Sequence, residues 1–250
     1  MKNPYPRLIR KLDHPPAGPN WVRFVHHDPV KSAKSILEWI FGRPKFTYKP
    51  GYKAIKDRIE LGIDHNTAMR IAIGTGPFAG REHNKSLIDA FFNYDAQRQY
   101  RCQNPIEFEP EYFRVSRDII VPVAPLSIIR ENGRFLPIFI CGWNALSLSL
   151  FQRRLLMTVY EDAFLSLTDF QDSAAEIVFF PKRLLDDGVR REAEVWNRGD
   201  YELLSRASLN EAIETFLLAR DSALQIISER SNQWSNQADG EDSPESGPPF

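Results

Sequence analysis

Cationic and aromatic side chains alternate from Tyr5 to Lys56. The six cations that we expect to contact phosphates are Arg7, Arg10, Lys11, Arg23, Lys45 and Lys49. The rings among them include Tyr5, Trp21, Phe24, Trp39, Phe46, Tyr48 and Tyr52. Because cations bind phosphates and rings stack on bases, this mixture is typical of a surface for single-stranded nucleic acid. A second interpretation stays open: the rings dock on the rest of the protein while the lysines stay in water.

Signatures of metal sites and nucleophiles are missing from the sequence. The five histidines are His14, His26, His27, His65 and His83. No two of them have the i, i+4 spacing of a helical metal site, and adjacent His26 and His27 point to different sides of the chain. The pattern G-x-S-x-G is absent, and neither Cys102 nor Cys141 lies in a recognisable signature. We therefore expect no metal site and no serine or cysteine nucleophile.

Glycines cluster between Ile73 and Gly80, where small residues could let backbone donors approach a phosphate. The spacing is G-x-G-x-x-x-G, and no G-K-[ST] follows it. Pro77 also removes one of the backbone donors that a phosphate loop needs. We therefore predict a tight turn in this segment.

Hydrophobic periodicity predicts the elements that must position these residues. Helices are expected at 30–41, 52–61, 86–94 and 147–167, with a last helix opening on the capping box Ser208–Glu211, and strands at 113–123, 126–130, 135–141 and 176–180. Residues 68–73 read as a strand or as the end of a helix. Asn132-Gly133 predicts a tight hairpin, while Pro122 and Pro137 favour bulges or edge positions. The class is therefore α/β or α+β, with a mixed central sheet of about four to five strands flanked by helices.

Charge is distributed unevenly along the chain. Residues 1–60 hold 13 Lys and Arg against 5 Asp and Glu, a net charge of +8. Residues 61–230 hold 19 against 24, a net of -5, and residues 231–250 hold none against 4, a net of -4. The proline-rich residues 1–30 are expected to form an extended basic arm, residues 31–230 a single domain, and residues 231–250 a disordered acidic tail.

Residues 84–181 resemble the α-β-β-β-α-β core of the restriction-endonuclease-like, PD-(D/E)XK family in their order of helix, three strands, long helix and strand. The resemblance implies an acid on the second strand and a D/E-x-K element on the third, which together bind a divalent metal and activate water. Arg117-Asp118 lies where the first acid is expected. Glu82 or Asp89, near the preceding helix, would add a ligand.

The third strand departs from that pattern, because Leu136–Trp143 contains no acid and no lysine. No lysine anywhere in the chain has Asp or Glu two positions before it. The chain therefore lacks the residues for the family's standard mechanism, and we expect no enzyme activity and no cofactor. An alternative stays open, a nuclease with a migrated Mg²⁺ site in which Asp118 converges with some of the carboxylates at Glu82, Asp89, Glu107, Glu109 and Glu111.

Composition narrows the class of protein. The chain is 42% hydrophobic, which argues against disorder over most of its length, and its apolar stretches are too short for a membrane helix. No apolar leader opens the chain, so a cytoplasmic protein is expected. We expect a non-catalytic binding or assembly protein that contacts nucleic acid through its basic N-terminal region. A protein-protein module with exposed tryptophans among Trp21, Trp39, Trp143 and Trp196 is the remaining alternative.

Overall fold

The centre of the protein is a four-stranded mixed sheet. The computed structural model describes residues 3–42, 46–101, 105–186 and 188–240. The strand order is β3 (Ser127–Glu131), β4 (Arg134–Cys141), β5 (Glu176–Phe179) and β8 (Glu194–Asn197). β3 and β4 are antiparallel, β4 and β5 are parallel, and β5 and β8 are antiparallel. This sheet confirms the expected mixed α/β class.

Local signals in the sequence set two of the connections between strands of the central sheet. The hairpin between β3 and β4 turns at Asn132 and Gly133, whose φ angles of 50° and 79° are those of the tight turn that an Asn-Gly pair favours. The parallel pair needs a crossover, which is made by α7 (Leu150–Tyr160) and the π-helical turn Glu161–Leu165. Ser149 and Gln152 form a capping box that starts α7.

Helices cover both faces of the sheet. On one face lie α4 (Lys49–Leu61), α5 (His65–Gly74) and, after the short turn Phe78–Gly80, α6 (Arg81–Arg98). Ile55 and Phe91 of this layer share a core with Ile138 and Val178 of the sheet. α7 covers the other face, so the parallel strands β4 and β5 lie between two apolar layers. The open choice at residues 68–73 is settled as helix, within α5.

Two small sheets complete the strands. β1 (Glu111–Arg114) pairs with β2 (Ile120–Val123), and β6 (Lys182–Leu185) pairs with β7 (Gly188–Arg191). The single strand expected at 113–123 is wrong, because the N–H groups of Val115 and Ser116 bond to the carbonyl of Ile119 and turn the chain back. β6, β7 and β8 were not predicted from the sequence.

The expected extended arm is wrong, because the first part of the chain folds into α1 (Tyr5–Asp13), α2 (Gly18–Val22) and α3 (Pro29–Phe41). Prolines lie at the first or second position of each of these helices, where a missing N–H costs nothing. Trp21 of α2 is fully buried, with its ring 5.5 Å from that of Phe113 and 5.3 Å from that of Phe216. These helices therefore belong to the core of the domain.

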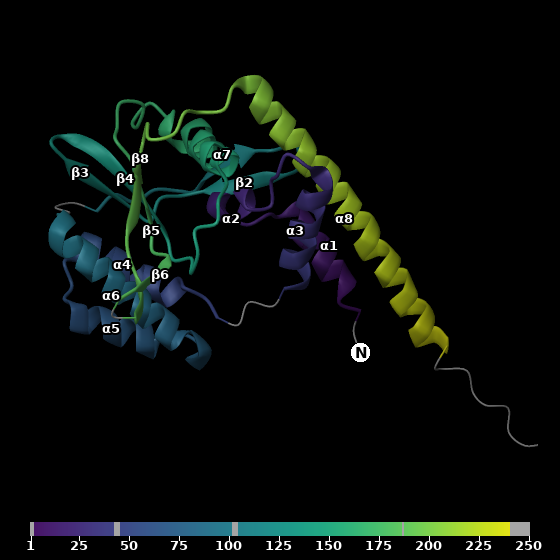
Figure 1. Ribbon diagram of the computed structural model, residues 1–250, viewed down its shortest axis with the longest axis horizontal. Helices are drawn as coiled ribbons and strands as arrows, with labels where there is room; N and C mark the ends of the chain where they lie inside the picture. Colours follow the sequence, from purple (N-terminus) through teal and green to yellow (C-terminus); the bar gives the residue numbers. More distant parts are fainter. Residues whose placement is uncertain (1–2, 43–45, 102–104, 187, 241–250) are drawn as a thin grey trace, which may run out of the picture.

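The last helix, α8 (Arg206–Gly240), runs alongside α1 and α3, on the opposite side of the molecule from α4, α5 and α6 (Figure 1). It begins before the expected capping box, because Ser205 Oγ accepts from the N–H of Ser208. It also continues through residues 231–240 of the segment expected to be a disordered tail, and residues 241–250 lie outside the described residues. Within the described part of the chain, no helix is both long and apolar enough to cross a membrane.

Candidate functional site

Several of the expected phosphate contacts gather around a cavity between α1, α2 and α3. The cavity has a volume of about 600 Å³ and is lined by Lys11, Pro16, Asn20, Arg23, Phe24, Ser35, Glu38, Trp39 and Gly42. Lys11 Nζ lies 5.7 Å from the centre of the Trp39 ring. The ring of Phe24 is 5.3 Å from the ring of Trp39. A cation and two aromatic rings therefore share one wall of the cavity.

A second cavity lies beside the first and shares Lys11 and Gly42 with it. Its volume is about 490 Å³, and its other lining residues are Pro4, Tyr5, Arg7, Leu8, Ile40 and Phe41. We call the two cavities together the α1–α3 groove. An ion pair between Asp13, at the end of α1, and Arg220 of α8 holds α1 in place beside it. Packing of the N-terminal helices against α8 therefore builds the groove.

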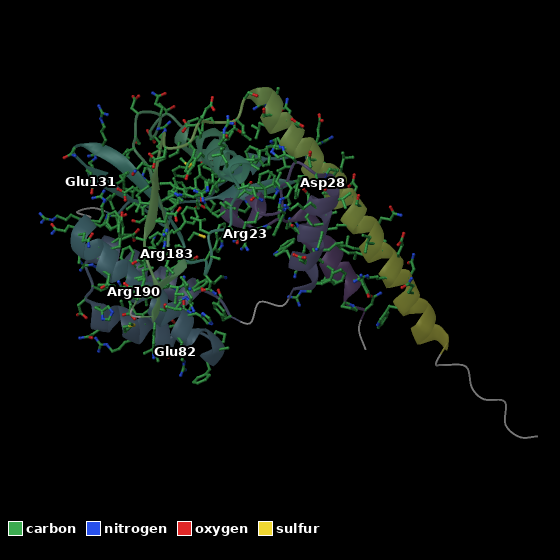
Figure 2. The ribbon with its side chains drawn as sticks, in the orientation of Figure 1. Arg23, Asp28, Glu82, Glu131, Arg183 and Arg190 are labelled. Atoms are coloured by element: carbon green, nitrogen blue, oxygen red, sulfur yellow. The ribbon has the colours of Figure 1, made fainter. Side chains whose placement is uncertain are left out.

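Arg23 connects the α1–α3 groove to the end of the central sheet. Its guanidinium carbon lies 4.7 Å from the centre of the Trp143 ring, and Trp143 follows β4 directly after Gly142. The indole Nε1 of Trp143 donates to Asn20 Oδ1 at 3.1 Å, which fixes the ring against α2. Figure 2 shows Arg23 beside α2, between the sheet and the helices of the groove.

The positive charge of the groove is not balanced by acids. In the part of the chain that the structure describes, Arg7, Lys11 and Arg23 form no ion pair with a carboxylate. Glu38 is the one acid among the described residues that line the two cavities. A surface with unpaired cations beside aromatic rings attracts polyanions and offers stacking partners for bases.

The structure brings together three of the six expected phosphate contacts, namely Arg7, Lys11 and Arg23. Arg10 is exposed on α1 but lines neither cavity. Lys49 is exposed at the start of α4, and Lys45 lies outside the described residues. The aromatic residues divide in the same way, because Trp21 is a core residue whereas Tyr5, Phe24 and Trp39 line the groove.

The carboxylates of the nuclease alternative do not assemble into a metal site among the described residues. Asp118 is exposed in the turn between β1 and β2, outside the four-stranded sheet, and its N–H bonds to Ser116 Oγ. Glu82 pairs with Lys85, and Asp89 pairs with His65. No group of three or more His, Cys, Asp and Glu side chains that could hold a metal ion occurs in residues 3–42, 46–101, 105–186 and 188–240.

The tryptophans expected to mark a protein-protein surface are mostly inside the protein. Trp21 and Trp196 are buried, while Trp39 and Trp143 are half-buried and belong to the groove and its edge. Two of the four candidates for that surface, Trp21 and Trp196, therefore fill the core. An apolar cavity between α3 and α8 is lined instead by Val30, Ala33, Leu37, Phe41 and Ile226, with Lys34, Glu38 and Ser222 around them.

A second group of cations, which the sequence reasoning missed, lies at the carboxyl ends of β4 and β5. Arg191 at the end of β7 is only 5% exposed. Its Nη1 donates to the carbonyls of Gly142, Trp143 and Phe180, and its Nη2 donates to Tyr48 Oη and Asn144 Oδ1, both at 2.6 Å. Lys182 lies directly opposite Arg191 in the β6–β7 hairpin. We call Tyr48, His83, Asn144, Lys182 and Arg191 the strand-end cluster.

Burial shifts the pKa values of two side chains of the strand-end cluster, His83 and Tyr48. Burial lowers the pKa of His83, and the charges of Lys182 and Arg191 lower it further. Burial raises the pKa of the Tyr48 hydroxyl, against the opposing effect of Arg191. Burial also raises the pKa of the nearby Cys141 thiol, so this thiol is not a nucleophile. With two cations and several hydrogen-bond donors, the cluster is suited to holding an anion.

The remaining sequence candidates have structural roles. His26 Nε2 lies 3.0 Å from Ser35 Oγ, and the His27 ring is 4.0 Å from that of Phe151. Asp28 caps α3 by accepting from the N–H of Val30. The glycine segment contains the end of α5 and a turn in which Gly76 has a φ of 114°, which confirms the predicted tight turn.

Comparisons with known proteins identify no relative of this chain. No family of proteins, no characterised protein and no solved structure matches the chain. The resemblance of residues 84–181 to the restriction-endonuclease-like core therefore stays a prediction.

Proposed function

We propose that this protein binds single-stranded nucleic acid in the α1–α3 groove, as a non-catalytic binding or assembly protein. The observation that carries the proposal is the position of Lys11 and Arg23, two cations without carboxylate partners among the described residues, each over a tryptophan ring. In this proposal Arg7, Lys11 and Arg23 hold phosphates, and Tyr5, Phe24 and Trp39 offer stacking surfaces to bases.

The proposal also covers the fold of the protein and its location in the cell. The mixed sheet with its helical crossover supports a nuclease-like core that has lost its D/E-x-K element, working in the cytoplasm without a metal. The nucleic acid would be bound and not cut, because Glu38 is the one carboxylate among the described residues that line the groove, and a metal-dependent nuclease needs several. A protein partner on the apolar cavity between α3 and α8 would be compatible with this role, since that cavity adjoins the groove at Glu38 and Phe41 but is lined by neither Lys11 nor Arg23.

The test is the binding of a labelled thymidine oligonucleotide of about ten nucleotides, followed by fluorescence anisotropy as the salt concentration rises. The logarithm of the binding constant should fall linearly with the logarithm of salt, with a slope near -0.7 for each phosphate contacted. The double variant Lys11→Ala/Arg23→Ala should bind about tenfold or more weakly and should show a shallower slope. The matched control is Arg206→Ala, which removes a cation at the start of α8 that lines neither cavity of the groove. This variant should bind as the unmodified protein does.

Stacking is tested separately from charge with Trp39→Leu, a variant that keeps an apolar side chain at this half-buried position. It should weaken binding of the oligonucleotide by about tenfold, the value of one stacked base, but should leave binding of polyphosphate unchanged because polyphosphate has no bases. Binding without salt dependence, or equal binding by the double variant and the control, would contradict the proposal. Binding of polyphosphate and oligonucleotide with the same response to Trp39→Leu would identify a general anion surface instead.

A further inference from the structure

The β6–β7 hairpin places like charges directly opposite each other. The register pairs Lys182 with Arg191 and Arg183 with Arg190. Side chains directly opposite in an antiparallel pair lie on the same face and close together, so two cations there repel each other and weaken the hairpin. Each such pair calls for negative charge nearby.

The two pairs differ in how that charge is supplied. Arg183 forms a 2.8 Å ion pair with Glu194 and lies 4.0 Å from Glu192, and Arg190 lies 3.8 Å from Glu192. Acids within the protein thus compensate Arg183 and Arg190, which Figure 2 labels on the β6–β7 side of the sheet. For Lys182 and Arg191, no carboxylate within the described ranges forms an ion pair.

Arg191 is buried, so the absence of an opposite charge beside it is energetically more costly than at the protein surface. Its guanidinium is buried and donates to three backbone carbonyls and two neutral side-chain oxygens, so its hydrogen bonds leave the charge itself uncompensated. A buried cation without an opposite charge is costly, and an anion bound beside it relieves that cost. The carboxyl ends of parallel strands are also where α/β sheets bind ligands.

Groups that an anion could contact surround this charge. Lys182 is exposed, and its N–H bonds to the carbonyl of Asn144 at 2.8 Å, which brings the two residues together. The Asn144 side chain is exposed, with its oxygen held by Arg191 and Tyr48 and its amide nitrogen left to donate. His83 is stacked on Phe46 at 3.9 Å and feels the charges of both Lys182 and Arg191. Lys182, Asn144 and His83 therefore offer donors to an anion held at this end of the strands.

We propose that the strand-end cluster binds the terminal phosphate of a single-stranded nucleic acid. The inference rests on the proposed function, which places the nucleic acid in the α1–α3 groove. Trp143 joins the two sites, because its ring lies under Arg23 of the groove and its carbonyl accepts a hydrogen bond from Arg191 of the cluster. A nucleic-acid strand bound in the groove would therefore reach the cluster at one of its ends. A terminal phosphate monoester carries more negative charge than the diester phosphates within the strand, so it is the part of the ligand that this site would select.

The experiment compares thymidine oligonucleotides of equal length that carry a 5′-phosphate, a 3′-phosphate or no terminal phosphate. The protein should bind one phosphorylated form about tenfold more tightly than the unphosphorylated form, the value of one charge-assisted hydrogen bond, and the preferred form identifies which end is held. Lys182→Ala should remove this preference while keeping the affinity for the unphosphorylated strand. Arg183→Ala, which changes the neighbouring residue with its own carboxylate partners, is the matched control and should keep the preference.

A second measurement tests the site without the groove. Inorganic phosphate is titrated into the full chain while the imidazole signal of His83 is followed by NMR, assigned with His83→Asn. A shift of that signal that saturates, and that Lys182→Ala abolishes, supports the site even if no oligonucleotide binds and the proposed function fails. No response of His83 to phosphate, or equal binding of the three oligonucleotides, overturns the inference. A groove that binds all three equally would leave the proposed function standing without it.

Discussion

Arg98 and Glu131 are joined by two parallel hydrogen bonds of 2.9 and 2.8 Å, from Nη1 and Nη2 to the two carboxylate oxygens. Arg98 also donates from Nε to Glu176, which is buried at the start of β5. The hydroxyls of Tyr94 and Tyr100 give Glu176 two further donors. This network fastens the end of α6 to β3 and β5 and thereby fixes the helical layer against the sheet.

Arg98→Met should lower the free energy of unfolding by about 2 kcal/mol, because Glu176 is then left buried without a cation. The figure is below that of a fully buried pair since Arg98 and Glu131 are partly exposed. Urea unfolding at neutral pH is the measurement. Arg206→Met breaks an exposed pair with Asp162 and should change stability by less than about 0.5 kcal/mol. Equal losses for the two variants would show that the network does not stabilise the fold.

The turn between β3 and β4 gives a test of backbone strain. Gly133 has a φ of 79° and nothing within 4 Å of the position of a Cβ atom, so Gly133→Ala adds strain without a clash. We expect a loss of about 1 kcal/mol in thermal or urea unfolding. Gly74→Ala at the end of α5 meets equally open space without a positive φ and should be neutral or slightly stabilising.

Local sequence signals predicted the parts of the fold that local energetics decide. Asn132-Gly133 is sufficient to specify its turn, and the apolar stretch at Glu176–Phe179 is a strand buried on both faces. The N-terminal segment could not be assigned this way. Its prolines lie in the first turns of helices, and these helices are stabilised by distant contacts such as that of Trp21 with Phe113 and Phe216. Composition alone shows proline content and not those partners.

The candidate site shows the same limit. The unbalanced charge of residues 1–60 pointed to Arg7, Lys11 and Arg23, since a local excess of cations is visible in composition. The strand-end cluster draws Tyr48, His83, Asn144, Lys182 and Arg191 from four separate stretches of the chain. Its only sequence signal is the two pairs of adjacent cations at 182–183 and 190–191, which identify a cluster only when the hairpin register is known.

Stability should fall between about pH 7 and pH 5 in part through His26. Burial lowers the pKa of its imidazole below the ordinary 6.5, Lys31 lowers it further, and Asp28 opposes both. A folded-state pKa below the unfolded value means that the unfolded chain binds the proton more readily, so stability is full above pH 6.5 and is lost as the pH falls.

The check is the pH dependence of urea unfolding, compared between the unmodified protein and His26→Gln. The variant loses the contact with Ser35 and is less stable throughout, but its stability should change less between about pH 7 and pH 5. His83 shifts in the same direction, so His26→Gln/His83→Gln should flatten the curve further.

Asp118 is expected to be a surface residue without a catalytic role. Asp118→Ala should change the free energy of unfolding by less than about 0.5 kcal/mol and should leave oligonucleotide binding unchanged. We expect no cleavage of DNA or RNA by the unmodified protein when Mg²⁺ or Mn²⁺ is added. Metal-dependent cleavage that Asp118→Ala abolishes would restore the nuclease alternative, and Glu82→Gln and Asp89→Asn would then show which acids share the metal.

The repulsion between Lys182 and Arg191 predicts opposite effects of one variant with and without phosphate. In buffer free of phosphate, Lys182→Ala removes an uncompensated like charge, so it should leave stability unchanged or raise it by a few tenths of a kcal/mol. When phosphate is added, the unmodified protein should gain stability as a bound ligand requires, and the variant should gain less. Arg183→Ala instead removes a cation that Glu192 and Glu194 already compensate, so it should show the full phosphate effect. An anion site at Lys182 therefore predicts that Lys182→Ala does not lower the stability of the phosphate-free protein but does reduce the stabilisation that phosphate gives.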